Sequence, residues 1–206
     1  MRLMRTEYLI QRGPFAASTD GMKILSEIQV GISEVVWPAG SNRFTIRPVR
    51  KGNGVKPIKD GFLRHLESMG WQTEERVRIG ELATGPLDAV KTLSDGRKFA
   101  VEWETGNISS THRAINKMAL GMLRGELHGG AIVLPTRAMY HYLTDRIGNY
   151  EEIAPYFDVW RSWPHLQGLL AVIAIQHDDE SAHAPPIPKG NDGWRNFSPE
   201  ASTVQL

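Results

Sequence analysis

The spacing of hydrophobic residues predicts three amphipathic helices. Apolar residues between positions 22 and 36 recur every three or four residues, and this pattern ends before Trp37-Pro38. A second helix is predicted around 61–69. A third is predicted at about 110–123, with its apolar stripe on one side and Arg113 and Lys117 elsewhere. These segments predict helices that bury one face and leave the other polar.

Short apolar runs between these segments predict strands. Residues 87–93 and 99–104 flank Asp95-Gly96 and indicate a hairpin. Residues 44–46 indicate a short strand, and 131–134 and 169–175 indicate buried ones. Strands that alternate with helices predict an α/β fold. The chain is expected to form a single domain over 1–206, with 184–206, rich in Pro, Gly and Asn, as a C-terminal tail or arm.

Composition narrows the class of protein. With 41% hydrophobic and 23% charged residues, the 206-residue chain is neither disordered nor fibrous. It contains no Cys, which excludes disulfides, thiol nucleophiles and Cys-ligated metals and suits a reducing compartment. The longest uncharged apolar run, 166–175, is much shorter than the roughly 20 residues that cross a bilayer. We therefore expect no membrane association and a cytoplasmic protein.

The positive charge is concentrated in two stretches, although the net charge is only +1. Residues 43–59 contain six basic residues and no acid, and 105–125 contain three basic residues and no acid. The second stretch directly follows a group of carboxylates. A nuclease needs cations for phosphates beside carboxylates for a metal. A solvated basic loop is the alternative for 43–59.

Three acids carry the candidate chemistry. Glu102 and Glu104 leave the same face of a predicted strand, and Trp103 leaves the other. Asp88 lies on the partner strand. A two-residue loop at Asp95-Gly96 would set Asp88 opposite Trp103, whereas a loop of three or four residues, or a bulge, would bring it to the two glutamates.

Such a cluster needs positive charge. Two carboxylates about 4 Å apart repel by about 4 kcal/mol at an effective dielectric of about 20, so the cluster would raise a pKa or bind a cation. Oxygen ligands favour magnesium or manganese over zinc. From spacing alone, three exposed acids in a charged sheet remain an alternative.

The sequence around these acids is more specific than their spacing. Four segments carry the signal: VRKGNGVKPIK, GPLDAVK, VEWETGNISSTHRAINK and HYLTDRIGNYEEIAPYF. Together they resemble the BamHI/OkrAI family of type II restriction endonucleases, with similarity from about Trp37 to Gly193 that is strongest over 85–156. The resemblance implies the PD-(D/E)-x-K core, a central mixed β-sheet flanked by helices, acting as a homodimer.

The resemblance also implies catalytic roles. Asp88 and Glu102 match metal-ligating acids for one or two Mg²⁺ ions, for which Mn²⁺ can substitute, and the Trp103 backbone carbonyl is a further ligand. Glu104 stands where the wider superfamily carries Lys, and a carboxylate there can deprotonate the attacking water. Glu74 matches another acid near the metals, although Glu75 is adjacent to it.

Further positions match DNA-contacting residues of the family. Base reading is implied for Asn107, Ser109 and Arg113 and for the pair Asp145 and Arg146, and minor-groove approach for Asp192 and Gly193. All five base-reading positions match, which implies the target GGATCC, cleaved between the two guanines to leave 5′ overhangs. Without the resemblance, a helix N-cap is an equally good interpretation of Ser109, and a surface ion pair is the alternative for Asp145 and Arg146. The sequence departs from the family after Gly193, at Trp194 and Pro199.

The partners follow from the same resemblance. They are palindromic double-stranded DNA, a second copy of the chain, and a cognate DNA methyltransferase of the same system without implied contact. The dimer contacts would involve Leu123, Arg124, Asp158 and Arg161, with an Arg124–Asp158 pair across the two-fold axis or ordinary surface ion pairs. The alternatives are a repair or structure-specific nuclease, a non-catalytic DNA-binding protein, and an enzyme acting on small acidic substrates.

Overall fold

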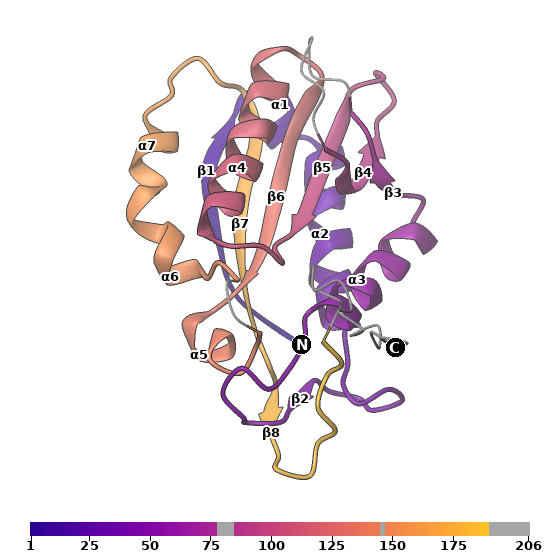
Figure 1. Cartoon of the computed structure of the whole chain (residues 1–206). Coiled ribbons are helices and arrows are strands. Elements are labelled where there is room, and N and C mark those ends of the chain that lie inside the picture. The colour runs from indigo at the N-terminus through magenta and orange to yellow at the C-terminus, as the bar shows by residue number, and fades with distance from the viewer. Residues whose placement is uncertain (78–84, 145–146, 190–206) are drawn as a thin grey trace, which may run out of the picture.

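The computed structural model describes residues 1–77, 85–144 and 147–189, and its centre is a six-stranded sheet (Figure 1). The strand order is β1-β7-β6-β5-β4-β3. The strands are β1 (Arg2–Arg12), β3 (Gln72–Glu75), β4 (Leu87–Thr92), β5 (Lys98–Trp103), β6 (Leu127–Pro135) and β7 (Gly168–Gln176). β5, β6 and β7 run parallel, and the other pairs are antiparallel, so the sheet is mixed.

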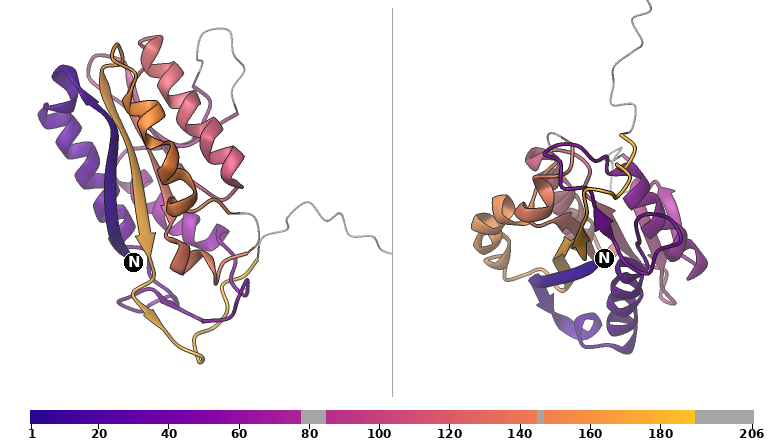
Figure 2. Two further views of the ribbon diagram at one scale, coloured as in Figure 1. Left: turned by 90° about the vertical axis from the view of Figure 1, so that its left-hand side faces the viewer. Right: turned by 90° about the horizontal axis from the view of Figure 1, so that it is seen from below.

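Helices cover both faces of this sheet (Figure 2). One face carries α1 (Gly13–Ala16), α2 (Thr19–Ser33) and α3 (Lys56–Ser68), and the other carries α4 (Ile108–Leu123), α6 (Tyr150–Ile153), the 3₁₀ turn η1 (Ala154–Tyr156) and α7 (Phe157–Arg161). Alternate residues of each strand enter the two apolar clusters, so that Val101 packs towards α2 and α3 and Ala100 towards α4. The sheet is thus buried on both sides, as its near-continuous apolar strands require.

A smaller layer extends from one end of the sheet. It contains α5 (Arg137–Tyr140) and a two-stranded parallel sheet of β2 (Thr45–Ile46) and β8 (Asp179–Glu180). β5, β6 and β7 all end at this edge because they are parallel, and the basic stretch 43–59 lies at the same end (Figure 1). No helix in the described parts of the chain has the length and apolar character needed to cross a bilayer.

The sequence pattern missed both edge strands. In β1, register shifts between Leu3 and Arg5 and between Tyr8 and Ile10 break the alternation of exposed and buried residues. β3 consists of polar residues only. An edge strand is paired on one side and partly exposed, so its apolar signal is weak. α3 also starts earlier than the predicted 61, because Pro57 occupies its first turn, where a missing N–H costs nothing.

The hairpin between β4 and β5 has the register that the carboxylates need. Thr92 pairs with Lys98, and the Leu93 amide donates to the Arg97 carbonyl at 2.9 Å, which leaves residues 94–96 as the loop. Gly96 takes φ of 83°, the left-handed region that Gly adopts without steric cost. Because Ala89 pairs with Val101, Asp88 faces Glu102. The loop has three residues, which is one of the arrangements that the sequence analysis left open for bringing Asp88 to the two glutamates.

The contact between β6 and β7 is expected to be intolerant of any side chain at Gly129. A Cβ there would lie 1.9 Å from the Leu169 carbonyl oxygen, a backbone atom that cannot move without opening the strand pair. We predict that Gly129→Ala lowers the free energy of unfolding by about 1–3 kcal/mol, measured by urea denaturation. In the control, Gly61→Ala in α3, the new Cβ meets atoms only at 3.9 Å, so this variant should be as stable as the parent or slightly more stable. Equal stability of the two variants would contradict this account of the sheet.

Candidate active site

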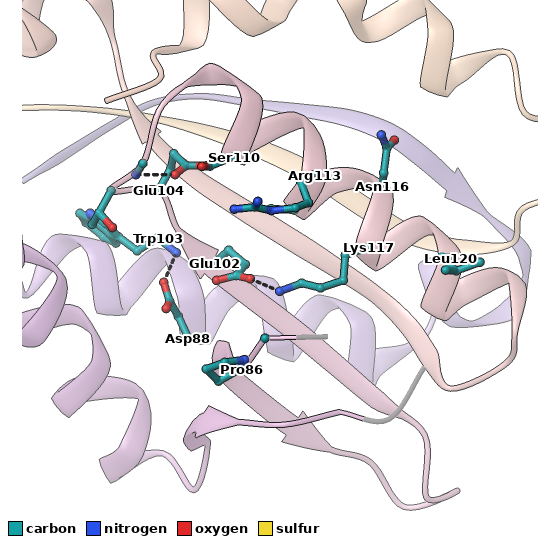
Figure 3. A pocket seen from close by; sticks show the side chains of 14 residues that line it. Pro86, Asp88, Glu102, Trp103, Glu104, Ser110, Arg113, Asn116, Lys117 and Leu120 are labelled. Carbon is teal, nitrogen blue, oxygen red and sulfur yellow. Dashed lines mark hydrogen bonds and ion pairs between the residues drawn. The ribbon is translucent and has the colours of Figure 1, made fainter. Parts of the chain in front are cut away.

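Three acids lie opposite one another on three neighbouring strands. Thr73 pairs with Ala89 and Ala89 with Val101, which aligns Glu74 of β3, Asp88 of β4 and Glu102 of β5 across the sheet. The Trp103 amide donates to Asp88 Oδ2 at 2.8 Å and fixes that carboxylate against the β5 backbone (Figure 3). Glu104 follows β5 on the same side of the chain as Glu102.

Lysines from both helical layers pair with three of these four acids. Lys59 Nζ of α3 lies 2.6 Å from Asp88 Oδ1 and 3.3 Å from Glu74 Oε1. Lys117 Nζ of α4 lies 2.6 Å from Glu102 Oε1 (Figure 3). The Lys side chains are only 18% and 14% exposed, so these pairs are weakly screened by solvent. Asp88 and Glu102 therefore each have a close positive counter-charge.

Glu104 is held by a backbone hydrogen bond instead. Its Oε1 accepts the Gly106 amide at 2.6 Å, and the Thr111 side chain also favours the charged carboxylate by lowering its pKa. The residue is 7% exposed. The dipoles of Gly106 and Thr111 therefore stabilise the Glu104 carboxylate more than the positive charge of Arg113 does.

Burial raises the pKa values of Asp88, Glu102 and Glu104. Burial and the charge of Asp88 raise the pKa of Glu102 to about 7, against the opposing effect of Lys117. Burial also raises the pKa of Asp88, although Lys59 and the Trp103 amide oppose the shift. The pKa of Glu104 is raised by burial as well, with Thr111 and Gly106 acting in the opposite direction. Such shifts concentrate at functional sites.

The acids line a cleft of about 930 Å³. Its walls are Pro86 and the β4–β5 acids on one side and the cleft-facing side of α4 on the other, including Arg113 and Lys117 (Figure 3). The cleft is large enough for an extended, charged substrate. The acids predicted from the sequence therefore line a cleft that also has cationic side chains on its walls.

The donor set fits a hard divalent cation, although the side chains are not yet arranged around one. Within 1–77, 85–144 and 147–189, no group of three or more acidic or His side chains has the geometry of a metal cage. Asp88 and Glu102 nevertheless supply carboxylate oxygens and already attract the ammonium groups of Lys59 and Lys117. Oxygen donors of this kind suit Mg²⁺ or Mn²⁺. The part predicted for the Trp103 carbonyl stays a prediction.

The side chains of Glu74 and Glu75 have different partners. Glu74 contacts Lys59, whereas Glu75 pairs with Lys98 at 3.3 Å. Glu74 has φ of 51°, a conformation that costs a non-Gly residue about 1 kcal/mol or more and is common at functional sites. Its side chain is 61% exposed. Of the two neighbours, Glu74 is the one beside the Asp88 carboxylate.

The predicted reading residues surround the start of α4. Asn107 is the N-cap, because its side chain accepts the Ser110 amide at 3.1 Å, so the alternative reading of Ser109 as the cap is wrong. Asn107, Ser109 and Arg113 are all exposed, and Arg113 lines the cleft. The remaining predicted DNA contacts lie outside the described residues: Asp145, Arg146, Asp192 and Gly193.

Asn53 is a structural residue that the sequence analysis missed. It is fully buried, and its Nδ2 donates to the carbonyls of Arg47 and Tyr142 at 2.9 Å each. The Thr144 amide donates to its carbonyl at 2.8 Å, and the Ile187 amide to its Oδ1 at 3.2 Å. Asn53 thereby joins the basic stretch to the segment before 145–146 and to the segment before the C-terminal tail.

The roles of Lys59 and Lys117 beside the acids were also missed. The sequence analysis counted both only as basic residues. Arg113 and Lys117 are four residues apart on α4, a spacing that places two cations on one helix face and could have indicated the acids as their partners. Lys59 carries no comparable signal, because only the packing of α3 against the sheet brings it to Asp88.

The predicted dimer contacts are only partly described by one chain. Leu123 of α4 is 64% exposed, and Tyr156 of η1 and Val159 of α7 are also exposed apolar residues, at 47% and 55%. Asp158 pairs with Arg161 of the same chain at 3.4 Å, and Arg161 also pairs with Glu7 at 2.7 Å. An Arg124–Asp158 pair between two chains stays a prediction.

Comparison with known proteins places this geometry in a family. The family model described as restriction endonuclease BamHI matches residues 1–194. The type II restriction enzyme OkrAI of Oceanobacter kriegii is 54% identical over 195 residues, 94% of this chain and 98% of that protein. The type II restriction enzyme BamHI of Bacillus amyloliquefaciens is 37% identical over 181 residues, 84% of this chain and 83% of that protein.

A solved structure supports the fold independently of sequence. The restriction endonuclease BglII, crystallised with a DNA 16-mer, superposes with a TM-score of 0.57 at 9% identity, covering 85% of this chain and 79% of that chain. The mixed sheet with helices on both faces is therefore a restriction-endonuclease fold, as the sequence resemblance implied. Given this fold and a family match over residues 1–194, the chain belongs to the BamHI family of type II restriction endonucleases.

Proposed function

We propose that this protein hydrolyses double-stranded DNA at the palindrome GGATCC, between the two guanines, in a reaction that requires Mg²⁺. The observation that carries the proposal is the convergence of Asp88, Glu102 and Glu104 in one cleft beside the exposed start of α4. Under this proposal residues 1–206 form one endonuclease domain and 184–206 its tail, of which 190–206 lie outside the described residues.

The different surroundings of the three acids support a division of roles. Asp88 and Glu102 each bind an ammonium group at 2.6 Å, so their oxygens face positions that favour a cation. Glu104 is oriented by the Gly106 amide and Thr111. We therefore assign Asp88 and Glu102, with Glu74 and the Trp103 carbonyl as further oxygen donors, to metal binding, and Glu104 to proton transfer.

The catalytic step follows from these assignments. One or two bound Mg²⁺ ions, or Mn²⁺ in their place, would polarise the phosphate, make water more acidic and stabilise the leaving oxygen. Glu104 accepts the proton of the attacking water, and the hydrogen bond from the Gly106 amide keeps the carboxylate aimed during the transfer. Its raised pKa makes it a stronger base than an exposed glutamate. Lys117 supplies positive charge to the phosphates in the cleft.

Sequence reading is assigned to residues at the start of α4 and to the pair Asp145 and Arg146. Asn107, Ser109 and Arg113 project from the start of α4, where Arg can contact guanine O6 and N7 with both arms of its guanidinium. Asp145 and Arg146 form the second reading pair. The amide of Gly148 donates to the Gly106 carbonyl at 2.8 Å, which ties the chain beyond this pair to the turn before α4. Asp192 and Gly193 are assigned to the minor groove.

The target implies the partners. A palindrome is read by two copies of the chain related by a two-fold axis, and the exposed apolar residues Leu123, Tyr156 and Val159 suit that interface. A cognate methyltransferase that protects host DNA in the cytoplasm follows from the proposed role. A repair nuclease or a non-catalytic DNA-binding protein on this fold would differ in the digestion pattern described next.

The central prediction concerns plasmid cleavage. With Mg²⁺ the protein should produce discrete fragments ending at GGATCC, and without metal no cleavage. Glu104→Gln should reduce the cleavage rate by about 10²- to 10⁴-fold, because the amide cannot accept the proton. The exposed Glu126→Gln is the control and should cut like the parent. A smear of fragments would indicate a nuclease without this selectivity, and retained cleavage by Glu104→Gln would exclude Glu104 as the base.

Metal binding should depend on pH around neutrality. The pKa of Glu102 is about 7 in the metal-free protein, so below this pH a cation must displace a proton from the carboxyl group. We expect the affinity for Ca²⁺ to fall about tenfold for each pH unit below about 7 and to level off above it. Isothermal titration calorimetry with Ca²⁺ between pH 5.5 and 8.5 measures this. An affinity that is constant from pH 6 to 8 would contradict the assignment of Glu102 as a ligand.

Selectivity should depend on Arg113. Replacing it by Ala removes one guanine contact per subunit, worth about 1–3 kcal/mol, so the ratio of cleavage rates at GGATCC and at single-mismatch sites should fall by about 10- to 100-fold. Arg97→Ala is the control, because Arg97 lies in the β4–β5 turn at the opposite end of the sheet and pairs with Asp95. If both variants discriminate as well as the parent, Arg113 does not read the sequence.

A further inference from the structure

Lys59 lies between Asp88, which lines the cleft, and Glu74 on the neighbouring strand β3. Its Nζ lies 2.6 Å from Asp88 Oδ1 and 3.3 Å from Glu74 Oε1, so one ammonium group bridges β4 and β3. α3 holds the Lys59 backbone in place, because Ile58 and Phe62 on either side of it are buried and Phe62 packs on the Trp103 ring at 4.9 Å. The ammonium group is therefore delivered to the acids by a rigid element.

Both oxygens of Asp88 are already engaged. Oδ2 accepts the Trp103 amide, a backbone bond set by the strand itself, and Oδ1 accepts Lys59. Asp88 is 8% exposed, so water does not readily replace either partner. Of these two partners only Lys59 has a flexible side chain that can withdraw. A divalent cation that is to use Oδ1 fully must compete with that ammonium group.

A DNA phosphate can become the new partner of the Lys59 ammonium group when that group leaves Asp88. An ammonium group without a counter-charge is unfavourable in a partly buried cleft. Under the proposed function, DNA brings phosphates into the cleft that Asp88 lines, next to the Lys59 ammonium group, and each phosphate can accept an ammonium group. DNA would thus stabilise the displaced position of Lys59, and the displaced lysine would leave Asp88 open to the cation.

We propose that Lys59 is a counter-ion of Asp88 that a bound metal displaces. This proposal rests on the proposed function of Asp88 as a metal ligand. Metal binding would then be weak without DNA and stronger with it. Lys59 is a positioning residue in this scheme, since it acts through Asp88. The coupling is reciprocal, because DNA must strengthen metal binding by the same factor by which metal strengthens DNA binding. The protein would then bind the metal weakly when free and more tightly once DNA is bound.

The test measures Ca²⁺ affinity by titration calorimetry on the full-length protein, with and without a GGATCC duplex. The duplex titrations use the Glu104→Gln background, which keeps the DNA intact. Lys59→Gln retains a hydrogen-bond donor for Asp88 but loses the charge. Lys59→Arg keeps the charge. Lys56→Gln is the matched control, because Lys56 is exposed and three residues earlier in the same helix.

Without DNA, we expect Lys59→Gln to bind Ca²⁺ at least about tenfold more tightly than the parent, and the duplex to strengthen its Ca²⁺ binding less than it does for the parent. Lys59→Arg and Lys56→Gln should behave like the parent. A purely structural role would lower the thermal midpoint of Lys59→Gln in EDTA and leave its Ca²⁺ affinity unchanged or weaker, and this result would overturn the proposal.

The protein with Lys59 intact provides a second measurement, which does not depend on the folding of any Lys59 variant. Its affinity for Ca²⁺ should rise at least about tenfold when the duplex is added, and an unchanged affinity would overturn the proposal. If the parent cuts plasmid with Mg²⁺ while Lys59→Gln shows no gain in Ca²⁺ affinity, the inference about Lys59 is wrong and the proposed function stands. If the parent binds no Ca²⁺ with or without DNA, both are wrong.

Discussion

The repulsion between buried carboxylates is the constraint around which this site is built. Asp88 and Glu102 face each other across the β4–β5 hairpin, and both are mostly removed from water. In such surroundings a negative charge needs a close positive charge or several hydrogen bonds. The fold meets this need for each acid in turn, with Lys59 for Asp88, Lys117 for Glu102 and the Gly106 amide for Glu104.

The compensating groups come from both sides of the sheet. Lys59 belongs to the α3 layer and Lys117 to the α4 layer, while the acids belong to the sheet between them. A site assembled from three layers depends on the packing of the whole core, including contacts such as Phe62 on Trp103. Its electrostatics and the stability of the fold are consequently linked, since a shift of either helix would leave a buried acid without its partner.

The site and the surface assigned to base reading share one short piece of chain. β5 ends at Trp103, Glu104 follows, and Asn107 caps α4 three residues later. The same turn therefore positions a catalytic candidate and the first reading candidate. Asn53 adds a second connection, because its hydrogen bonds join the basic stretch to the segments that lead to 145–146 and to the tail. The proposed chemistry and the proposed reading by Asn107 would thus share one turn at the edge of the sheet.

The sequence by itself determined the α/β class, the buried strands, the helix at 110–123 and the candidate acids, because these depend on local periodicity and on residue type. It also carried the family resemblance, which the comparisons confirmed. The sequence pattern could not show the edge strands β1 and β3, whose hydrogen bonds come from distant neighbours, nor the early start of α3 at Lys56.

Only the tertiary structure decided the register that sets Asp88 opposite Glu102 and the choice of Glu74 over Glu75 as the neighbour of Asp88. It also decided which cations meet which acids. Lys59 and Asp88 are 29 positions apart and on different layers, so their contact has no signature in the local sequence. Register and charge pairing are properties of packed elements, because they depend on how a loop closes and how a helix docks, and neither is encoded in the residues of one element alone.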